Sequence, residues 1–493
     1  MSRPNILMIM PDQQRADCIG CFGNPYIQTP NIDALAARGM KFTNAYANHP
    51  VCGPSRVNLM TGWYPHTRGH RTLTHLVQDH EPNMLKYLKE GGYQVAFAGA
   101  RGDVFAPGVT EDSTHFCGWT TKPNKMGMGP QFDEGSALYD AFYHGKRPGD
   151  NWVDFDEAAT QTALDWLADG VNGTNGTNGT NGPDGPWCLW VPLIFPHLPF
   201  EVEDPWYSMY TANDVAPRIR HHGSGKPGFH QAIRDKLGTS RLTEPEWQEI
   251  QRVYYGMISR VDWQLGRIME QVDKIGATDD TVTLFFTDHG EYAGDFGLVE
   301  KWPYGLDNCL LQNPLIVAGP GIQSGATAHT FTEMVDILPT VLELAEIKPG
   351  HTHFGKSLVP VLKNAKEEIR TCAYAEGGFA ISELDLLEQA RGEYAGKASL
   401  QHEQPELVGK AVSLRTQQFT YVYRLYEDDE LYDREADPTE TKNLAKEAQY
   451  KNQIEKLKTD VLEWLLTTAD VIPWAADPRF PKIPHGQHEV FKR

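Results

Sequence analysis

The sequence predicts an α/β protein with a mostly parallel central sheet, followed by a smaller α+β region with an antiparallel sheet. Short, wholly apolar runs alternate with helical segments over the first 365 residues, and strands that are buried on both faces are typical of parallel sheets. After about residue 365, apolar residues begin to alternate with polar ones, which is typical of half-exposed antiparallel strands. We therefore expect a large domain over residues 1–365 and a C-terminal subdomain over residues 366–493.

Four apolar runs are the predicted strands of the central sheet. They span residues 6–10, 187–194, 281–286 and 315–318. Three of these runs lead into polar groups, namely Asp12, His197 and the pair that begins at Asp288. Because ligands of open α/β sheets bind outside the carboxyl ends of the strands, we expect these side chains to meet at one edge of the sheet.

Helices are predicted between these strands. Thr29 and Pro30 begin one helix and Gly39 ends it, because proline suits the first helical turn and glycine follows helix ends. A long helix is predicted from about residue 244 to 275, where apolar side chains recur at helical spacing. Another, over residues 333–344, contains Pro339 and is predicted to kink there.

The remaining segments are predicted from composition and periodicity. Residues 172–182 repeat Asn-Gly-Thr, which cannot form a core, so we expect an exposed loop inside the large domain. In the C-terminal subdomain, residues 410–416 and 419–424 alternate like half-exposed antiparallel strands. An amphipathic helix follows, with apolar residues from Ile454 to Leu465 at helical spacing.

Composition excludes several classes of partner. The chain has 493 residues and a net charge of −20, which argues against nucleic-acid binding and against docking on an anionic membrane surface. No apolar run reaches the roughly 20 residues that span a bilayer. The N-terminus lacks the features of a signal peptide, and the seven cysteines are scattered, so we expect a cytoplasmic protein with reduced thiols.

The strongest local signal lies around Cys52. Pro54 suits the first turn of a helix, so Cys52 is predicted at a helix N-terminus, where backbone amides and the helix dipole favour an anion and activate a thiol or its derivative. Arg56 follows one turn later and is placed to bind an oxyanion through two parallel hydrogen bonds. In isolation, a buried cysteine before a proline turn explains the same residues equally well.

The segment Cys52-Gly-Pro-Ser-Arg56, followed by Leu59-Met-Thr-Gly62, resembles the signature of the type I sulfatases, which are members of the alkaline phosphatase superfamily. The resemblance implies an alkaline-phosphatase-like α/β/α sandwich and makes residues 1–365 its catalytic domain. It also implies that a formylglycine-generating maturation enzyme oxidises Cys52 to formylglycine, whose hydrated form is the nucleophile.

Further segments resemble the family from about residue 3 to residue 470. Asp12-Gln13 is similar to the first metal-binding turn, and Pro196-His197-Leu198-Pro199 is similar to a motif that supplies an active-site histidine. The resemblance implies the catalytic residues Cys52, Arg56, His197 and Lys301. It implies the metal ligands Asp12, Gln13, Cys52, Asp288 and His289.

The chemistry of these residues supports the assembly. Their donors are mostly oxygen atoms, which suit Ca²⁺, and Mg²⁺ or Mn²⁺ remains an alternative. The cation is expected to polarise a sulfate oxygen and to lower the pKa of the diol on residue 52. Arg56 and Lys301 are expected to neutralise charge on the transferring group, and His197 to bind sulfate or to protonate the leaving oxygen.

The substrate-binding residues are less well defined. Many sulfatases carry Gly-Lys-x-His where this chain has Gly99-Ala100-Arg101-Gly102, so the family's lysine and histidine are missing and Arg101 is a candidate anion contact. The segment after the Cys52 motif is rich in cationic and titratable groups. We expect His70, Arg71 and His75 to contact the substrate, although a solvated loop explains some of them as well.

Hydrolysis of a sulfate ester is the leading hypothesis, with a small anionic sulfate ester or sulfated saccharide as the substrate. A phosphonate monoester or phosphodiester hydrolase of the same superfamily is the alternative, favoured by Gln13 in the first metal turn and by the missing lysine and histidine. A catalytically silent, anion-binding member of the fold is the third hypothesis. The oligomeric state is left open, and a homo-oligomer is compatible with the sequence.

Overall fold

The computed structural model of the protein describes residues 3–99, 102–149, 151–169, 183, 185–220 and 225–471. Its centre is an eight-stranded sheet with the strand order β11-β2-β10-β9-β1-β7-β4-β5. The strands are β1 (Asn5–Met10), β2 (Met40–Phe42), β4 (Gln94–Ala98), β5 (Phe116–Gly118), β7 (Trp187–Pro192), β9 (Thr281–Phe286), β10 (Leu315–Ala318) and β11 (Ala326–Ala328). The predicted loop over residues 172–182 lies outside the described residues.

The central sheet is mostly parallel, as predicted. β1 pairs in parallel with β7 and with β9, and β4 pairs in parallel with β7 and with β5. β10 is different, because it runs antiparallel to both of its neighbours, β9 and β2, so its inclusion among the parallel strands was wrong. Its apolar run indicates that both faces are buried but does not indicate the direction of the strand. The α-helix between β9 and β10, α10 (Asn308–Leu311), is short, whereas parallel neighbours usually need a longer crossover.

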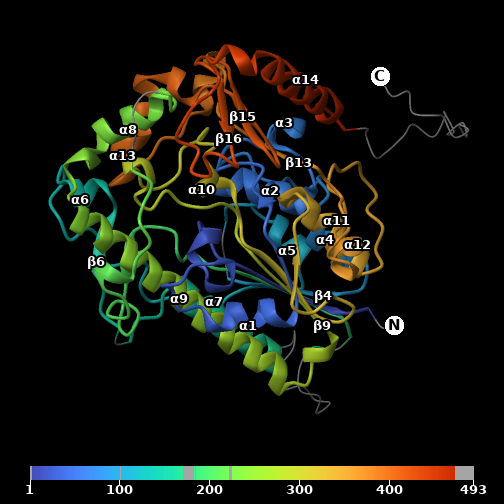
Figure 1. The fold of residues 1–493 in the computed structure, drawn as a ribbon. Coiled ribbons are helices and arrows are strands. Elements are labelled where there is room, and N and C mark those ends of the chain that lie inside the picture. Colours follow the sequence, from blue (N-terminus) through green and yellow to red (C-terminus); the bar gives the residue numbers. More distant parts are fainter. Residues whose placement is uncertain are drawn as a thin grey trace, which may run out of the picture.

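Helices cover both faces of this sheet, which gives the predicted α/β/α sandwich (Figure 1). Along β1, Leu7 and Ile9 belong to one hydrophobic cluster, whereas Ile6 and Met8 belong to the other. The helices of the first cluster are α1 (Pro30–Arg38), α7 (Phe155–Asp169) and α9 (Glu244–Lys274). Those of the second are α2 (Cys52–Thr61), α4 (Met84–Glu90), α11 (Ile337–Leu344) and α12 (Val359–Lys363).

Two of these helices match their predicted limits, and a third differs in one respect. α1 and α9 lie where proline, glycine and helical periodicity predicted them, and a reciprocal capping box between Thr243 and Glu246 begins α9. The predicted kink at Pro339 is not found, so this prediction was wrong. A separate 3₁₀ turn, η7 (Met334–Asp336), precedes α11, so Pro339 lies in the first turn of α11, where its missing N–H is tolerated.

A four-stranded antiparallel sheet forms the C-terminal part of the fold, as predicted. Its strands are β13 (Cys372–Gly377), β14 (Ala411–Thr416), β15 (Phe419–Arg424) and β16 (Glu430–Asp433), in that order. The prediction that these strands are half exposed was wrong, because both faces of β14 and β15 are buried. Leu414 and Tyr421 pack with α14 (Lys451–Thr468), whereas Ala411 and Val422 join the main core.

A further helix of this C-terminal part, α13 (Tyr394–Glu403), packs against α8 (Gly228–Leu237) of the larger part. This contact brings residues from after position 366 next to the edge of the central sheet where β1 and β9 end. Among the described helices, none is both long enough and apolar enough to cross a membrane.

Candidate active site

The turn after β1 places two polar side chains at the carboxyl edge of the sheet. Asp12 and Gln13 are both fully buried, and Gln13 has a positive φ of 65°, which non-glycine residues adopt at an energetic cost. Three hydrogen bonds hold Gln13 in this conformation. Its backbone N–H donates to Asp288 (3.2 Å), its Oε1 accepts from Lys301 Nζ (3.0 Å), and its Nε2 donates to Glu291.

The turn after β9 brings Asp288 and His289 to the same edge. Potential ligand atoms of Asp12, Cys52, Asp288 and His289 all lie within 4.8 Å of one another, and all four residues are buried. His289 Nδ1 donates to the Gly290 carbonyl oxygen at 2.8 Å, which leaves Nε2 facing Cys52 Sγ at 3.2 Å. Burial lowers the pKa of His289, so the imidazole is neutral, as metal ligation requires. The structure therefore assembles four of the five predicted metal ligands in one cluster.

Arg56 lies at the base of this cluster and contacts three carboxylates. It donates to Asp12 Oδ2 at 2.7 Å, to Asp288 Oδ2 at 2.9 Å and to Asp103. Three carboxylates thus gather around one guanidinium, and two of them, Asp12 and Asp288, are fully buried. Carboxylate oxygens suit a hard divalent cation, and the residues present therefore fit the metal that the sequence predicts.

Cys52 is the first residue of α2, as predicted, and every residue of this helix is buried. The expected activation of its thiol is not found. Burial raises the pKa of Cys52 well above its usual range, and the charge of Asp12 adds to this effect. The unmodified side chain is therefore a protonated thiol and a poor nucleophile. The helix N-terminus, which favours a thiolate, is outweighed at this position.

Lys301 and His197 meet on the other side of Cys52. Lys301 Nζ lies 3.0 Å from His197 Nε2 and 2.7 Å from Glu300 Oε1. Since His197 Nδ1 faces the Leu198 carbonyl oxygen at 2.7 Å, Nδ1 carries the imidazole proton and Nε2 accepts from Lys301. Burial and then the Lys301 charge lower the pKa of His197 to about 4. Burial opposes the charge on Lys301, but neighbouring negative groups such as Glu300 raise its pKa well above the usual range.

A cavity of about 720 Å³ opens onto these groups. Cys52, His197 and Lys301 line its inner end. Residues 72–75 also line it, and so do ten residues between positions 385 and 401 of the C-terminal part, which form one wall of the cavity. Sequence reasoning missed this wall completely, because no motif marks residues 385–401 and their place in the site depends on how α13 packs.

The predicted substrate contacts are only partly brought to this cavity. His75 lines it and is solvent-exposed. His70 instead faces the His75 carbonyl oxygen at 2.8 Å and Glu81 at 3.2 Å, and Arg71 is paired with Glu383. Arg101 lies outside the described residues.

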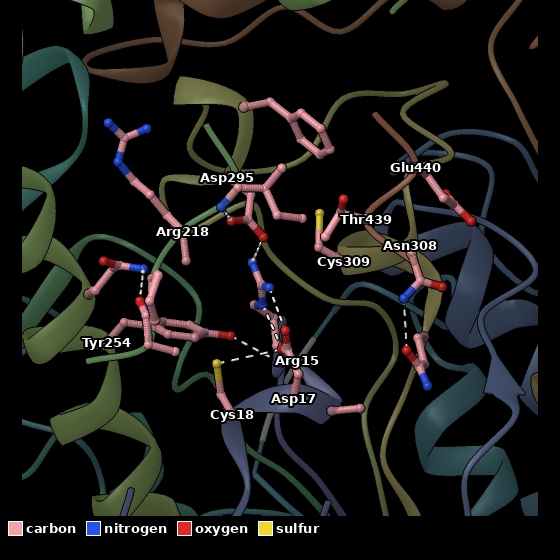
Figure 2. Close-up of a pocket in the computed structure, with 18 of the residues that line it drawn as sticks. Arg15, Asp17, Cys18, Arg218, Tyr254, Asp295, Asn308, Cys309, Thr439 and Glu440 are labelled. Atoms are coloured by element: carbon pink, nitrogen blue, oxygen red, sulfur yellow. Dashed lines mark hydrogen bonds and ion pairs between the residues drawn. The ribbon is translucent and has the colours of Figure 1, made fainter. Parts of the chain in front are cut away.

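A second cavity, of about 280 Å³, lies beside the segment that follows β1 (Figure 2). Arg15 is its central cation, and its guanidinium contacts Asp17 at 2.6 Å and Asp295 at 2.7 Å. Two carboxylates thus balance this arginine. The described residues that line the cavity include none of the predicted catalytic residues, so we place the chemistry in the larger cavity.

The sequence profile of the sulfatase family matches residues 4–347, which is most of the chain. The chain belongs to the sulfatase family. It is accordingly a sulfuric ester hydrolase, and membership of this family implies in general a metal ion and a formylglycine residue.

Individual relatives agree with this assignment. The sulfatase is 26% identical to an N-acetylglucosamine-6-O-sulfatase of Bacteroides thetaiotaomicron, over 92% of this chain and 85% of that protein. It is 26% identical to a choline-sulfatase of Rhizobium meliloti, over 90% of this chain and 82% of that protein. The crystal structure of a phosphonate monoester hydrolase of Agrobacterium radiobacter superposes with a TM-score of 0.74, at 25% identity, covering 94% of this chain and 96% of that chain.

Proposed function

We propose that this sulfatase hydrolyses its ester with a formylglycine derived from Cys52, next to a divalent cation held by the Asp12–His289 cluster. The observation that carries the proposal is the convergence of Cys52 with three further buried ligand groups within 4.8 Å. When matured and hydrated, residue 52 supplies one hydroxyl as the nucleophile and a second hydroxyl whose deprotonation expels sulfate. The raised pKa of the unmodified thiol supports this reading over direct attack by Cys52 itself.

Asp12, Asp288 and His289 are proposed to hold the cation, together with Gln13 and the oxygen of matured residue 52. Ca²⁺ is the preferred ion because the donors are mainly carboxylate and amide oxygens. When bound, a cation of this kind polarises a sulfate oxygen and lowers the pKa of a neighbouring hydroxyl. Arg56 orients the two carboxylates by donating to one oxygen of each.

Lys301, oriented by His197, is proposed to protonate the leaving group. In the resting site the shared proton lies on Lys301, because His197 Nε2 accepts from Lys301 Nζ and the pKa of His197 is about 4. The Lys301 ammonium neutralises charge on the sulfate and donates a proton toward the oxygen of the departing alcohol. His197 orients Lys301 through this hydrogen bond, and His197 Nε2 is the nearest base that can exchange a proton with Lys301.

Peptide mass spectrometry of the segment around Cys52, from protein made in its native host, tests the nucleophile. We expect the mass of the aldehyde in place of that of the thiol. An unmodified cysteine would instead favour a silent, anion-binding member of the fold. The same result would remove the need for the formylglycine-generating partner that the proposal requires.

Phosphonate or phosphodiester hydrolysis is the second candidate. Gln13 in the first metal turn favours it, and so does the likeness to a phosphonate monoester hydrolase. Parallel assays with 4-nitrophenyl sulfate and 4-nitrophenyl phenylphosphonate distinguish the two candidates. We expect the larger kcat/KM on the sulfate, and a larger value on the phosphonate would overturn the proposal.

A further inference from the structure

The part of the cavity lining that comes from residues 385–401 is rich in hydrogen-bond acceptors. We call Asp385, Glu388 and Gln401 the acceptor wall, since all three line the cavity and belong to the C-terminal part of the chain. Asp385 is exposed at the mouth, Glu388 is half-buried, and Gln401 is only 3% exposed. The exposed fraction of these side chains thus decreases from Asp385 through Glu388 to Gln401.

Gln401 and Glu388 form its inner part. Burial and then the charge of Glu300 raise the pKa of Glu388, whereas Gln401, which lines the same cavity, acts in the opposite direction. The oxygen end of the Gln401 amide is unsatisfied, because Gln401 Oε1 is buried and has no hydrogen-bond partner among the described residues. A buried carbonyl oxygen without a donor costs free energy, so its presence in a cavity wall points to a ligand that donates there.

The charges around the cavity also favour a ligand that donates hydrogen bonds. Its described lining contains four carboxylates and two lysines, which are Asp103, Glu300, Asp385, Glu388, Lys301 and Lys397. Lys397 is already bound to Glu300 and to the Lys301 carbonyl oxygen. A sulfate ester adds another negative charge next to Lys301. Among the described lining residues, carboxylates therefore outnumber lysines, and the sulfate adds a further negative charge.

Apolar side chains flank the acceptor wall. Leu73 lies on the side formed by residues 72–75, and Leu386 and Leu387 lie beside Glu388. Such walls suit the methylene groups of an organic alcohol. Two of the groups that the sequence predicts as substrate contacts are paired with carboxylates of the protein, His70 with Glu81 and Arg71 with Glu383.

We propose that the acceptor wall binds a protonated amine on the alcohol portion of the substrate, so that this sulfatase acts on sulfate monoesters of amino alcohols. An ammonium group offers three donors and no acceptor, which matches the Glu388 carboxylate and Gln401 Oε1. The substrate is then zwitterionic, with its sulfate at Lys301 and its ammonium at Glu388. The inference rests on the proposed sulfatase activity and adds the class of alcohol to it.

A series of ω-aminoalkyl sulfates with two-, four- and six-carbon chains tests the proposal, each compared with the alkyl sulfate that carries a methyl group in place of the ammonium. Three lengths are needed because the amine must reach the acceptor wall while sulfate lies at residue 52. We expect kcat/KM to favour the amine by about tenfold or more at one length at least, as expected for a charge-assisted hydrogen bond. Glu388→Gln should reduce that preference to within about threefold, and because the preference is a ratio of two kcat/KM values in one variant, a uniform loss of activity does not change it.

Asp428→Asn serves as the matched control, because this carboxylate is exposed and is not among the residues that line the cavity. The control variant should keep the full preference for the amine. An equal or higher kcat/KM for the methyl-terminated ester at every length would overturn the inference, provided that 4-nitrophenyl sulfate is hydrolysed. Failure to hydrolyse 4-nitrophenyl sulfate or any other sulfate ester would instead count against the proposed function, so the two failures are distinguishable.

Discussion

The ammonium group of Lys397, in α13, donates a hydrogen bond to the main-chain carbonyl oxygen of Lys301. The same ammonium binds one oxygen of Glu300, and the other oxygen of Glu300 lies 2.7 Å from Lys301 Nζ. One carboxylate thus bridges two lysines, one from each part of the chain. A helix of the C-terminal part therefore fixes both the backbone and the side chain of the proposed proton donor.

Replacing Lys397 by methionine should lower kcat for 4-nitrophenyl sulfate by about tenfold while leaving KM within about twofold, because the substitution frees Lys301 to move without removing a sulfate contact. Steady-state kinetics check this expectation. Lys446→Met, at an exposed lysine, is the control. A rise in KM at constant kcat would show that Lys397 contacts the substrate directly.

Replacing Lys301 by methionine should lower kcat by roughly 100-fold or more with poor leaving groups, because the departing alkoxide then lacks a proton donor. The loss should be smaller with 4-nitrophenyl sulfate, whose leaving group needs little protonation. Rates for a series of aryl sulfates, plotted against the pKa of the phenol, measure the difference. An equal loss across the series would assign Lys301 to sulfate binding alone.

Removal of the divalent cation should lower the melting temperature, because the carboxylates of Asp12, Asp103 and Asp288 that gather around Arg56 would then lose a counter-charge. Thermal melts with and without a chelator check this directly. Asp288→Asn removes one of the three charges, so its melting temperature should respond less to the chelator. A chelator response as large as that of the parent would argue against a cation at this cluster.

Titration of His144, which is not among the residues lining the active-site cavity, should make the free energy of unfolding depend on pH. Burial opposes its charge, but hydrogen bonds to Glu201 and Glu393 outweigh burial and raise its pKa from 6.5 to about 9. A raised pKa in the folded state means that the stabilisation is fully present below pH 6.5 and is lost as the pH rises through about 9. Denaturant unfolding should therefore show a smaller alkaline loss of stability in His144→Gln than in the parent protein.

Much of the fold could be predicted from local sequence. Apolar runs located β1, β7 and β9, and the polar residues that follow them, Asp12 and Asp288, converge as the strand-end rule requires. Strand direction was not predictable in the same way. The run 315–318 is apolar because helices cover both faces of the sheet, and this burial is the same whether β10 is parallel or antiparallel.

The inner site was also accessible from the sequence, since its residues lie in short motifs. The outer site was not. Gln401 and Glu388 look like ordinary residues of a polar helix and loop, and they reach the cavity only because α13 packs against the larger part of the fold. The expected activation of Cys52 failed for a related reason, because a motif reveals the helix N-terminus but not the burial and the carboxylate that raise the thiol pKa.

The burial of Cys52 limits when its side chain can be oxidised. In the folded protein the residue is 5% exposed and lies within a helix whose neighbours are all buried. An enzyme that modifies this side chain needs access to it, and the side chain of Cys52 is enclosed once α2 has packed. Under the proposed mechanism, oxidation of Cys52 would have to precede the packing of α2, and chains that fold first would lack the nucleophile. The active fraction of a preparation then depends on the rate of synthesis relative to the supply of the modifying enzyme.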